Sequence, residues 1–561
     1  MSFTTIPVRE LVDQAVQGRL DIPEFQRDFV WRPDQVRSLV DSLYRDYPIG
    51  QILTWTNPSY TAPRGPSGTP ANRVWLVDGQ QRTTALCLVF GKKPYWWPEG
   101  RDWERRLAST NVVADLLAPG PDPEFRLTNP VRATDPRWIP VRTVVSKEAA
   151  AGPESMGAYF RATAKAVLEK LPAPIAAAAS EETVVQRLTA IWAIRERPVA
   201  LSEVHHEIED VTEIFTRLNQ QGTAVVESDV SLAVAAGMRP GWIREEFLPF
   251  LKNLSESGYD LEPGVVLRSL TAIGDGRVRL TSVSPDFWVS GDFEKHWSQA
   301  KQSLSAVVSG LAGGGLLSSS LLPSHTVLIP VTVLHAKYGP EGFHFPRALH
   351  WLLSATRDGR YSGASTSALD EDVRAIKGAD TFPEALEALR QRLEIDVRVA
   401  PEEFLEREAW SRPMALLLYL TAFHRKATDW VTRARLGYPR AEGALEYGFV
   451  PYWHHFFPTG RSVLRAVRFD YTEDEVGALA NLVFLNQKPP DRAWVTTPPS
   501  KYVHDASVYN HALELQMIAL DRALWEPERY RDFLAERAKL CARETNTFLA
   551  SLLGSVASAE P

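Results

Sequence analysis

The sequence predicts a multidomain α+β protein, and three observations lead to this fold class. The chain has 561 residues, which is more than one hydrophobic core of ordinary size can organise. Its first part mixes strand and helix patterns, and its middle is mostly helical by apolar periodicity. Its last part shows two short strands before terminal helices. We therefore expect domains at residues 1–235, 236–440 and 441–561.

The first domain should alternate helices with strands. Pro33 stands where a first helical residue is favoured. The apolar residues that follow it at helical spacing are Val36, Leu39, Val40 and Leu43. The runs "QILTW" and "RVWLV" predict strands on either side of a loop rich in Pro, Gly and Ser. Further along, residues 91–142 suggest irregular structure or short strands, residues 155–195 helices, and "PVALSEV" another strand.

The remaining segments complete the expected fold. Residues 309–324, "SGLAGGGLLSSSLLPS", are predicted as a surface loop between helices because glycine and serine dominate them. The segments "VPYWHHFFPTG" and "LANLVFLNQ" predict the two strands of the last domain. Residues 507–552 predict its long terminal helices.

Composition limits the classes of function. The net charge is -7, so any contact with nucleic acid has to come from local basic patches. The cysteines, Cys87 and Cys541, are too few and too far apart for a disulfide framework or a zinc site, and we expect buried thiols. The sequence has no secretory signal and no apolar run long enough to span a membrane, so we expect a soluble, cytoplasmic protein.

The segment "LVDGQQRTTAL" contains more polar residues than a turn between a strand and a helix needs. A glycine at such a junction lets the N–H groups of the helix N-terminus approach an anion. Arg82 adds a planar set of donors for phosphate, and Asp78 could hold a divalent cation, orient a water or accept a ribose hydroxyl. A plain turn in which Arg82 pairs with Asp78 is the alternative.

Two other stretches place polar residues among apolar ones. Gln26 and Arg27 lie inside "IPEFQRDFVW", so their side chains should face a specific partner rather than open water. The adjacent histidines of "WHHFFP" would point to opposite faces of a regular strand, one buried and one exposed. Downstream, Asn481 stands at the mouth of the second predicted strand, and Asp491 follows.

The first of these segments resemble a known family. "IPEFQRDFVW", "LVDSLYRDYPIGQILTW", "WLVDGQQRTTAL" and "IFTRLNQQGTAVVESDVSLA" are similar to the N-terminal domain of GmrSD-type, modification-dependent type IV restriction enzymes. That domain is similar to the ParB/sulfiredoxin-like fold, and the likeness covers about the first 235 residues. The resemblance implies nucleotide binding and hydrolysis at a set of residues that share one pocket: Gln26, Arg27, Asp78, Gly79, Gln80, Gln81 and Arg82.

The C-terminal pattern resembles the ββα-metal (HNH) nucleases that are fused behind such N-terminal domains. The resemblance implies His454 as a metal ligand, His455 as the general base and Asn481 as the residue that orients the base. Asp491 takes the place of the usual final Asn or His, and its carboxylate suits Mg²⁺ or Mn²⁺, with Asn486 as a fallback ligand. A neutral imidazole can take a proton from water at physiological pH.

Basic residues near this second site predict contacts with DNA. Arg461 and Arg465 lie at helical spacing and Lys501 follows in the same region. Such side chains bind the phosphate backbone, although a solvated helix face explains the arginines equally well.

The leading hypothesis is a single-chain, modification-dependent restriction endonuclease in phage defence. Its expected cofactors are a divalent metal (Mg²⁺ or Mn²⁺) and a nucleoside triphosphate: GTP, ATP, CTP or UTP. Its expected partner is double-stranded DNA, in particular modified phage DNA, with no membrane contact; a homodimer is left open. One alternative is a ParB-like NTPase or phosphotransferase whose C-terminal domain binds DNA without cutting it. The other is a non-catalytic, nucleotide-regulated DNA-binding protein.

Overall fold

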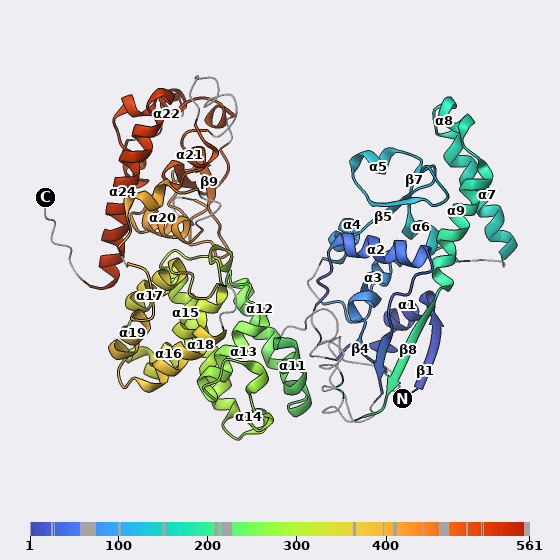
Figure 1. Ribbon diagram of the computed structural model, residues 1–561, viewed down its shortest axis with the longest axis horizontal. Helices are drawn as coiled ribbons and strands as arrows, with labels where there is room; N and C mark the ends of the chain where they lie inside the picture. Colours follow the sequence, from blue (N-terminus) through green and yellow to red (C-terminus); the bar gives the residue numbers. More distant parts are fainter. Residues whose placement is uncertain are drawn as a thin grey trace. The chain divides into compact units, whose positions relative to one another are not determined.

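The chain forms two compact units, residues 1–246 and 247–561. The computed structural model describes residues 2–23, 26, 28–56, 74–98, 102–148, 153–206, 211, 214, 227–362, 366–396, 398–407, 412–440, 443–458, 471–489, 492–505, 508 and 510–554. Both units contain helices and strands (Figure 1), so the predicted α+β class is confirmed.

The first unit is built from short strands and amphipathic helices. Its strands are β1 (Ser2–Pro7), β2 (Leu20–Asp21), β3 (Ile52–Trp55), β4 (Val74–Asp78), β5 (Val112–Asp115), β6 (Glu124–Leu127), β7 (Trp138–Pro140) and β8 (Pro198–Val204). Its helices are α1 (Val8–Val16), α2 (Pro33–Tyr44), α3 (Gln80–Phe90), α4 (Trp103–Ser109), α5 (Pro130–Thr134), α6 (Val141–Val145), α7 (Pro153–Glu169), α8 (Ala173–Ala178), α9 (Glu181–Ala193), η1 (Ile194–Glu196) and α11 (Glu227–Met238). A π-helical turn, η2 (Ile243–Phe247), follows at the end of the unit.

The main sheet of this unit has the strand order β1-β8-β3-β4-β2. β1 and β8 are antiparallel, as are β3 and β4, whereas β3 runs parallel to β8 and β2 parallel to β4. Helices α1, α2 and α3 cover one face. The predicted helix at Pro33 is confirmed as α2, and its four apolar residues at helical spacing are all buried.

Alternation along the strands produces a core on each face of the sheet. Ile52 and Leu76 point toward the helices and join the large core that α1, α2 and α3 complete. Trp55, Trp75 and Val77 point to the other face and form a smaller apolar cluster. Asp78 follows Val77 at the end of β4, so its position in the pleat matches that of Leu76, on the helix side.

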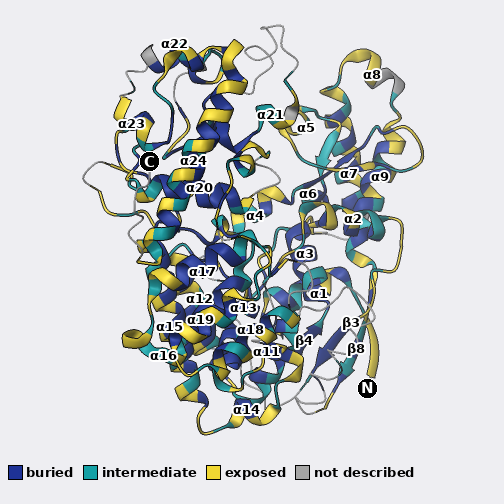
Figure 2. Cartoon of the chain, turned by 60° about the vertical axis from the view of Figure 1, so that its left-hand side comes forward, coloured by how far each residue is buried: buried dark blue, intermediate teal, exposed yellow. Residues whose placement is uncertain are grey.

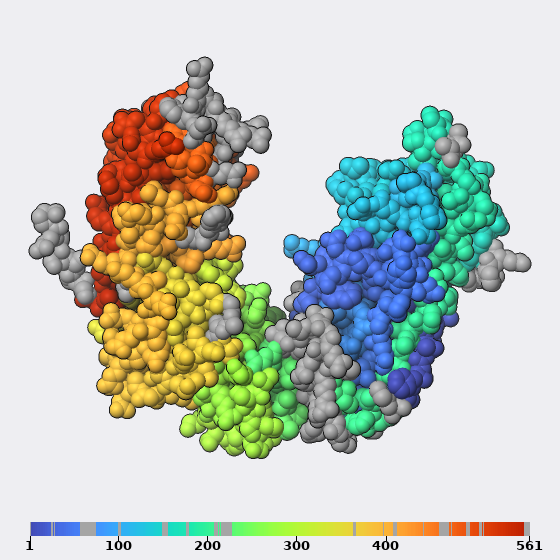
Figure 3. All heavy atoms as spheres, in the orientation of Figure 1, coloured from blue at the N-terminus to red at the C-terminus, as the bar shows by residue number. Residues whose placement is uncertain are grey.

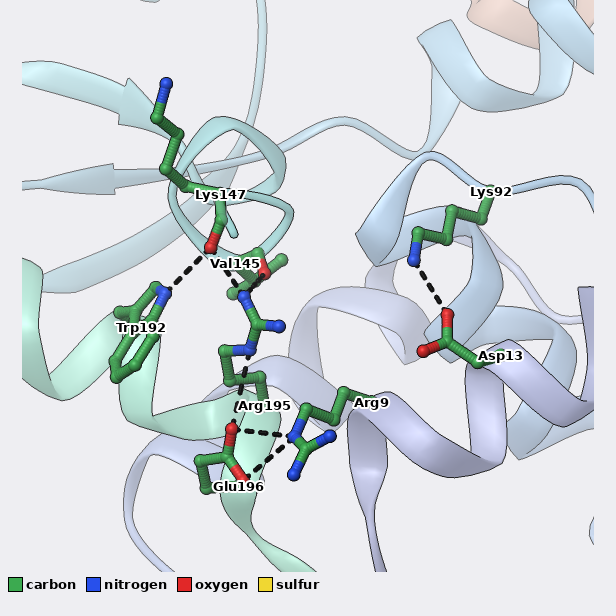
Figure 4. Close-up of polar contacts among 8 residues, drawn as sticks. All are labelled: Arg9, Asp13, Lys92, Val145, Lys147, Trp192, Arg195 and Glu196. Atoms are coloured by element: carbon green, nitrogen blue, oxygen red, sulfur yellow. Dashed lines mark hydrogen bonds and ion pairs between the residues drawn. The ribbon is translucent and has the colours of Figure 1, made fainter. Parts of the chain in front are cut away.

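Polar contacts fasten helix ends at the rim of this unit (Figure 4). Arg9 of α1 pairs with Glu196, its Nε lying 2.8 Å from Oε1, and Lys92 just after α3 pairs with Asp13 of α1 at 2.7 Å. Trp192 Nε1 donates to the carbonyl of Lys147 at 3.0 Å. The ion pairs are half-exposed, so each contributes at most about 1 kcal/mol, and the apolar core remains the main source of stability.

The second unit is mostly helical. Its first part contains α12 (Leu248–Glu256), α13 (Pro263–Gly274), η3 (Leu280–Ser282), α14 (Pro285–Val289), α15 (Phe293–Gly313), η4 (Ser319–Leu321), η5 (His325–Val327), α16 (Leu328–Gly342), α17 (Phe345–Arg357), α18 (Thr366–Gly378), α19 (Phe382–Arg390), η6 (Pro401–Leu405) and α20 (Arg412–His424). Its second part contains β9 (Tyr452–His455), α21 (Glu473–Val476), η7 (Leu479–Asn481), β10 (Leu482–Leu485), η8 (Arg492–Val495), α22 (Pro499–Asp505), α23 (Asn510–Leu515), η9 (Arg522–Trp525), η10 (Pro527–Arg529) and α24 (Tyr530–Leu552).

Helix α24 packs against both parts of the second unit. It contacts α17, α20 and η6 of the first part and η7 and η9 of the second. The C-terminal residues, orange to red in Figure 3, gather at one end of the unit, where α24 lies beside α20 (Figure 1). The predicted connector and nuclease domains therefore share one compact unit, apart from residues 236–246. The boundary at residue 440 stays a prediction.

The prediction of a surface loop at residues 309–324 is wrong. Helix α15 continues to Gly313, and Leu316, Leu317 and Leu322 are buried. Figure 2 shows buried residues concentrated between α15 and the neighbouring helices. Two buried tyrosine hydroxyls donate hydrogen bonds to backbone carbonyls of this segment. Tyr259 donates to the carbonyl of Leu316 at 2.5 Å and Tyr419 to that of Gly315 at 2.9 Å. Residues 315–319 of this segment are therefore a buried turn after the end of α15.

Both cysteines are buried free thiols, as expected. Burial raises the pKa of the Cys87 thiol and raises that of Cys541 to about 11, so neither is a reactive thiolate at neutral pH. Within the residues described, none of the helices combines the length and the apolar character that a membrane crossing requires.

Candidate functional site

The first candidate site is the junction between β4 and α3. β4 ends at Asp78 and α3 begins at Gln80, which confirms the predicted step from strand to helix. Gly79 between them has φ 96° and ψ 7°, a left-handed conformation that favours glycine. A Cβ at Gly79 would lie 2.2 Å from Ile52 Cδ1, so no other residue fits without movement. The positive φ and the packing of Ile52 therefore require glycine at this position.

Arg82 is held at two points in this junction. Its Nη2 lies 2.9 Å from Asp78 Oδ2, and its Nη1 donates to the carbonyl of Ile49 at 2.9 Å. The ion pair that the plain-turn alternative requires is therefore present. The side chains of Asp78 and Arg82 are 39% and 18% exposed, so solvent reaches both partners. Phosphate binding by Arg82 stays a prediction, and it requires an anion to replace the Asp78 carboxylate.

The two glutamines bring the "IPEFQRDFVW" segment to the junction. Gln26 is buried, and its Nε2 donates to the carbonyl of Val77 at 2.7 Å. Gln81 accepts from the backbone N–H of Val30 at 2.9 Å and donates to the carbonyl of Asp28 at 3.0 Å. The structure thus joins Gln26 to the residue before Asp78. Arg27 lies outside the described residues.

The second candidate site is the antiparallel pair β9–β10. His455 faces Leu482 and His454 faces Val483 across the ladder. The predicted alternation is observed, because His454 is buried and His455 is partly exposed. Both predicted strands of the last domain are confirmed.

His454 lies among aromatic rings. Its ring centroid is 6.3 Å from that of Trp430, 6.0 Å from Trp494 and 6.1 Å from Tyr502. Burial, with the neighbouring His455 as a smaller cause, lowers the pKa of His454 to about 3. Its Nε2 is buried and has no hydrogen-bond partner among the residues described. The imidazole is therefore neutral and its Nε2 makes no hydrogen bond within the described residues, as a metal ligand requires, but Nε2 has no surface that an ion could reach.

Asn481 is fully buried and bonds only to backbone. Its Oδ1 accepts from the N–H of Phe457 at 2.8 Å, and its Nδ2 donates to the carbonyls of Phe457 at 2.9 Å and Val476 at 3.2 Å. Phe457 stands two residues after His455. Any effect of Asn481 on His455 therefore passes through the backbone at the exit of β9.

Other predicted residues of this site are only partly described. Asp491, Arg461 and Arg465 lie outside the described residues. Over the part of the chain that the structure covers, no three His, Cys, Asp or Glu side chains form a group that could hold a metal ion. Lys501 is exposed on α22, and the side chain of Asn486 accepts from Gly437 N–H at 3.1 Å, which occupies the proposed fallback ligand.

Sequence reasoning missed two buried residues that fix β10. Arg537 of α24 is fully buried and donates to the carbonyls of Ala480 and Leu482, on either side of Asn481. Gln516 donates to the carbonyl of Phe484 at 2.6 Å and accepts from its N–H at 3.2 Å. A signal for Arg537 was present, since it occupies an apolar position of α24, three residues after Leu534 and four before Cys541.

Comparison with known proteins concerns the first unit. Residues 8–234 match the model of the GmrSD restriction endonuclease, N-terminal domain. The match supports a GmrSD-type N-terminal region over these residues. The GmrSD-type region contains the whole β4–α3 junction together with Gln26, and the family is one of restriction endonucleases, which bind DNA.

A protein of Methanocaldococcus jannaschii, named uncharacterized protein MJ0686, is 33% identical to this chain over 98 residues. The match covers 15% of this chain, and the chain spans 17% of that relative's length. It therefore supports a local likeness and carries no function for the whole chain.

Proposed function

We propose that this chain is a modification-dependent restriction endonuclease in phage defence. Nucleoside triphosphate binding and hydrolysis at the β4–α3 junction regulate DNA cleavage at the β9–β10 pair. The observation that carries the proposal is the match of residues 8–234 to a restriction endonuclease family. The target is DNA with modified cytosines or a modified backbone.

The nucleotide step uses residues that are already close together. The first N–H groups of α3 would bind a phosphate, and Arg82 supplies a fork of donors for its oxygens. Asp78, released from Arg82 by the phosphate, orients a water or holds a divalent cation. The hydrogen bonds from Gln26 to Val77 and from Gln81 to Asp28 hold the segment "IPEFQRDFVW" against the junction.

The cleavage step assigns His455 as the general base. This imidazole, which is partly exposed although its Nε2 is buried, takes a proton from water, whose oxygen attacks the phosphorus while the leaving sugar oxygen departs. His454 and Asp491 are the residues that would hold a divalent cation, and the cation would stabilise charge on the scissile phosphate. Binding at His454 requires that its buried Nε2 become accessible. Asn481 fixes the exit of β9 and so the direction in which His455 points.

The test is cleavage of a panel of modified and unmodified phage DNAs, with and without Mg²⁺ or Mn²⁺ and each of the four nucleotides. We expect cleavage of modified DNA only, complete dependence on the cation, and a rate that changes with one nucleotide. Equal cleavage of modified and unmodified DNA would contradict the restriction role. Cleavage in the presence of a chelator would contradict the metal-dependent mechanism.

The buried Nε2 of His454 favours one other candidate, a nucleotide hydrolase whose C-terminal part binds DNA without cutting it. Phosphate release together with DNA binding, but without any strand break across the panel, would select this candidate.

A further inference from the structure

A basic cavity of about 510 Å³ opens in the second unit, beside the β9–β10 pair. It lies between the segment that follows α20 and helix α23, and four cationic side chains line it: Arg425, Lys426, Arg433 and Arg435. Of the carboxylates, Asp429 alone is among the described lining residues. The cavity is therefore chemically suited to an anion.

The segment that carries these cations has a fixed backbone. Lys426 and Arg433 have φ values of 63° and 61°, which are uncommon for residues other than glycine. Asp429 is fully buried at its centre, and its Oδ1 accepts from the N–H groups of Val431 and Thr432. Backbone hydrogen bonds thus satisfy the buried carboxylate and hold the loop in shape.

The cations differ in how far they are already neutralised. Arg425 pairs with Glu544, and His511 on the opposite wall lies 3.6 Å from Glu514. Lys426 and Arg435 are exposed, and neither forms an ion pair with a residue that the structure describes. These two charges are therefore available to a ligand.

The cavity shares a wall with the β9–β10 pair. Trp430 lines the cavity, and its ring meets that of His454 edge to face at 6.3 Å. Asp429 Oδ2 accepts from the N–H of Asn486, the residue directly after β10, at 2.8 Å. The ring of Trp430 separates the cavity from His454.

We propose that this cavity binds the phosphodiester backbone of the DNA duplex that is cut at the β9–β10 pair, with Lys426 and Arg435 as its main phosphate contacts. This inference rests on the proposed function. A nuclease site needs backbone contacts beside the scissile phosphate to fix the register of the duplex. A cation-lined cavity separated from His454 by the ring of Trp430 supplies them.

The experiment measures DNA affinity without cleavage. Full-length K426Q/R435Q and wild type are titrated in EDTA with a fluorescein-labelled modified duplex, and anisotropy is recorded from about 50 to 200 mM salt. The variant should bind about tenfold or more weakly, and the slope of log affinity against log salt should fall by about 2, because each lost phosphate contact removes about 0.9.

The matched control is K252Q/R374Q, which removes the same charge from exposed residues of the same unit that do not line the cavity. It should bind DNA within about twofold of wild type, and both variants should keep the wild-type Tm. An unchanged affinity and salt slope in K426Q/R435Q would overturn the inference and leave the proposed function intact.

Two further outcomes separate the possible failures. If the variant loses affinity for AMP or inorganic phosphate but binds the duplex normally, the cavity takes a small anion and the inference is overturned. If wild type itself binds no modified duplex, the proposed function fails first, and this inference fails with it.

Discussion

Replacing Asn481 by alanine should loosen the β9–β10 pair without unfolding the protein. The change removes three hydrogen bonds and leaves the N–H of Phe457 and the carbonyls of Phe457 and Val476 without their partner. Leaving buried groups unsatisfied costs about 1–3 kcal/mol each when no water replaces the partner, and partial solvation should limit the total to about 3 kcal/mol. Local opening should therefore become about 100-fold more frequent.

Hydrogen exchange with mass spectrometry measures this opening directly. Peptides that cover β9 and β10 should exchange about 100-fold faster in N481A, while peptides of the first unit keep wild-type rates. DNA cleavage should fall steeply, because His455 lies two residues before Phe457, and nucleotide hydrolysis should remain. The control is N253A, since Asn253 is exposed on α12. Wild-type exchange at β9 and β10 in N481A would refute the anchoring role of Asn481.

Three other perturbations test separate parts of the account. G79A should lose about 3 kcal/mol of unfolding free energy and G120A about 1 kcal/mol. Both glycines have positive φ, but only Gly79 has a side chain where the Cβ would lie, whereas Gly120 has open space around it. Equal losses in denaturant unfolding would show that the clash at Gly79 is relieved. Burial, and to a smaller extent Arg390, lowers the pKa of His350 from 6.5 to about 4. As the pH falls from 6.5 to 4, the imidazole therefore takes up a proton in the unfolded chain before it does so in the folded protein, and the folded protein loses stability. The stability gap between wild type and H350L should therefore shrink by about 3 kcal/mol over that window, and a constant gap in denaturant midpoints would contradict this. R82K should raise the Kd for the nucleotide about tenfold or more, whereas R45K should not; equal affinities by equilibrium dialysis would remove Arg82 from the phosphate site.

The spacing of apolar residues predicted those helices and strands that bury one face against the core. The spacing of apolar residues after Pro33 specifies the buried face of α2, whatever that face packs against. The segment at residues 309–324 was mispredicted because its environment is set from a distance. The hydroxyls of Tyr259 and Tyr419, distant in sequence, satisfy its carbonyls and allow Leu316 to be buried. Composition within the segment does not contain that information.

The candidate sites show the same division. The contact between Asp78 and Arg82 spans four residues at a helix start, so the sequence could suggest it. The contact between Arg82 and the carbonyl of Ile49 depends on how α3 meets the sheet edge, and no local pattern predicts it. Arg537 was detectable only as a charged residue in an apolar stripe, and its partners beside Asn481 emerge from the packing of α24.

The assignment of His455 as the base of a metal-dependent nuclease is tested most directly by comparing H455A with H205A, whose target is an exposed histidine just after β8. Both variants and wild type receive modified phage DNA, Mg²⁺ and nucleotide, and strand breaks and phosphate release are measured in the same reaction. The account predicts that H455A alone loses strand breakage while all three proteins hydrolyse nucleotide. Strand breakage by H455A at the wild-type rate would contradict it.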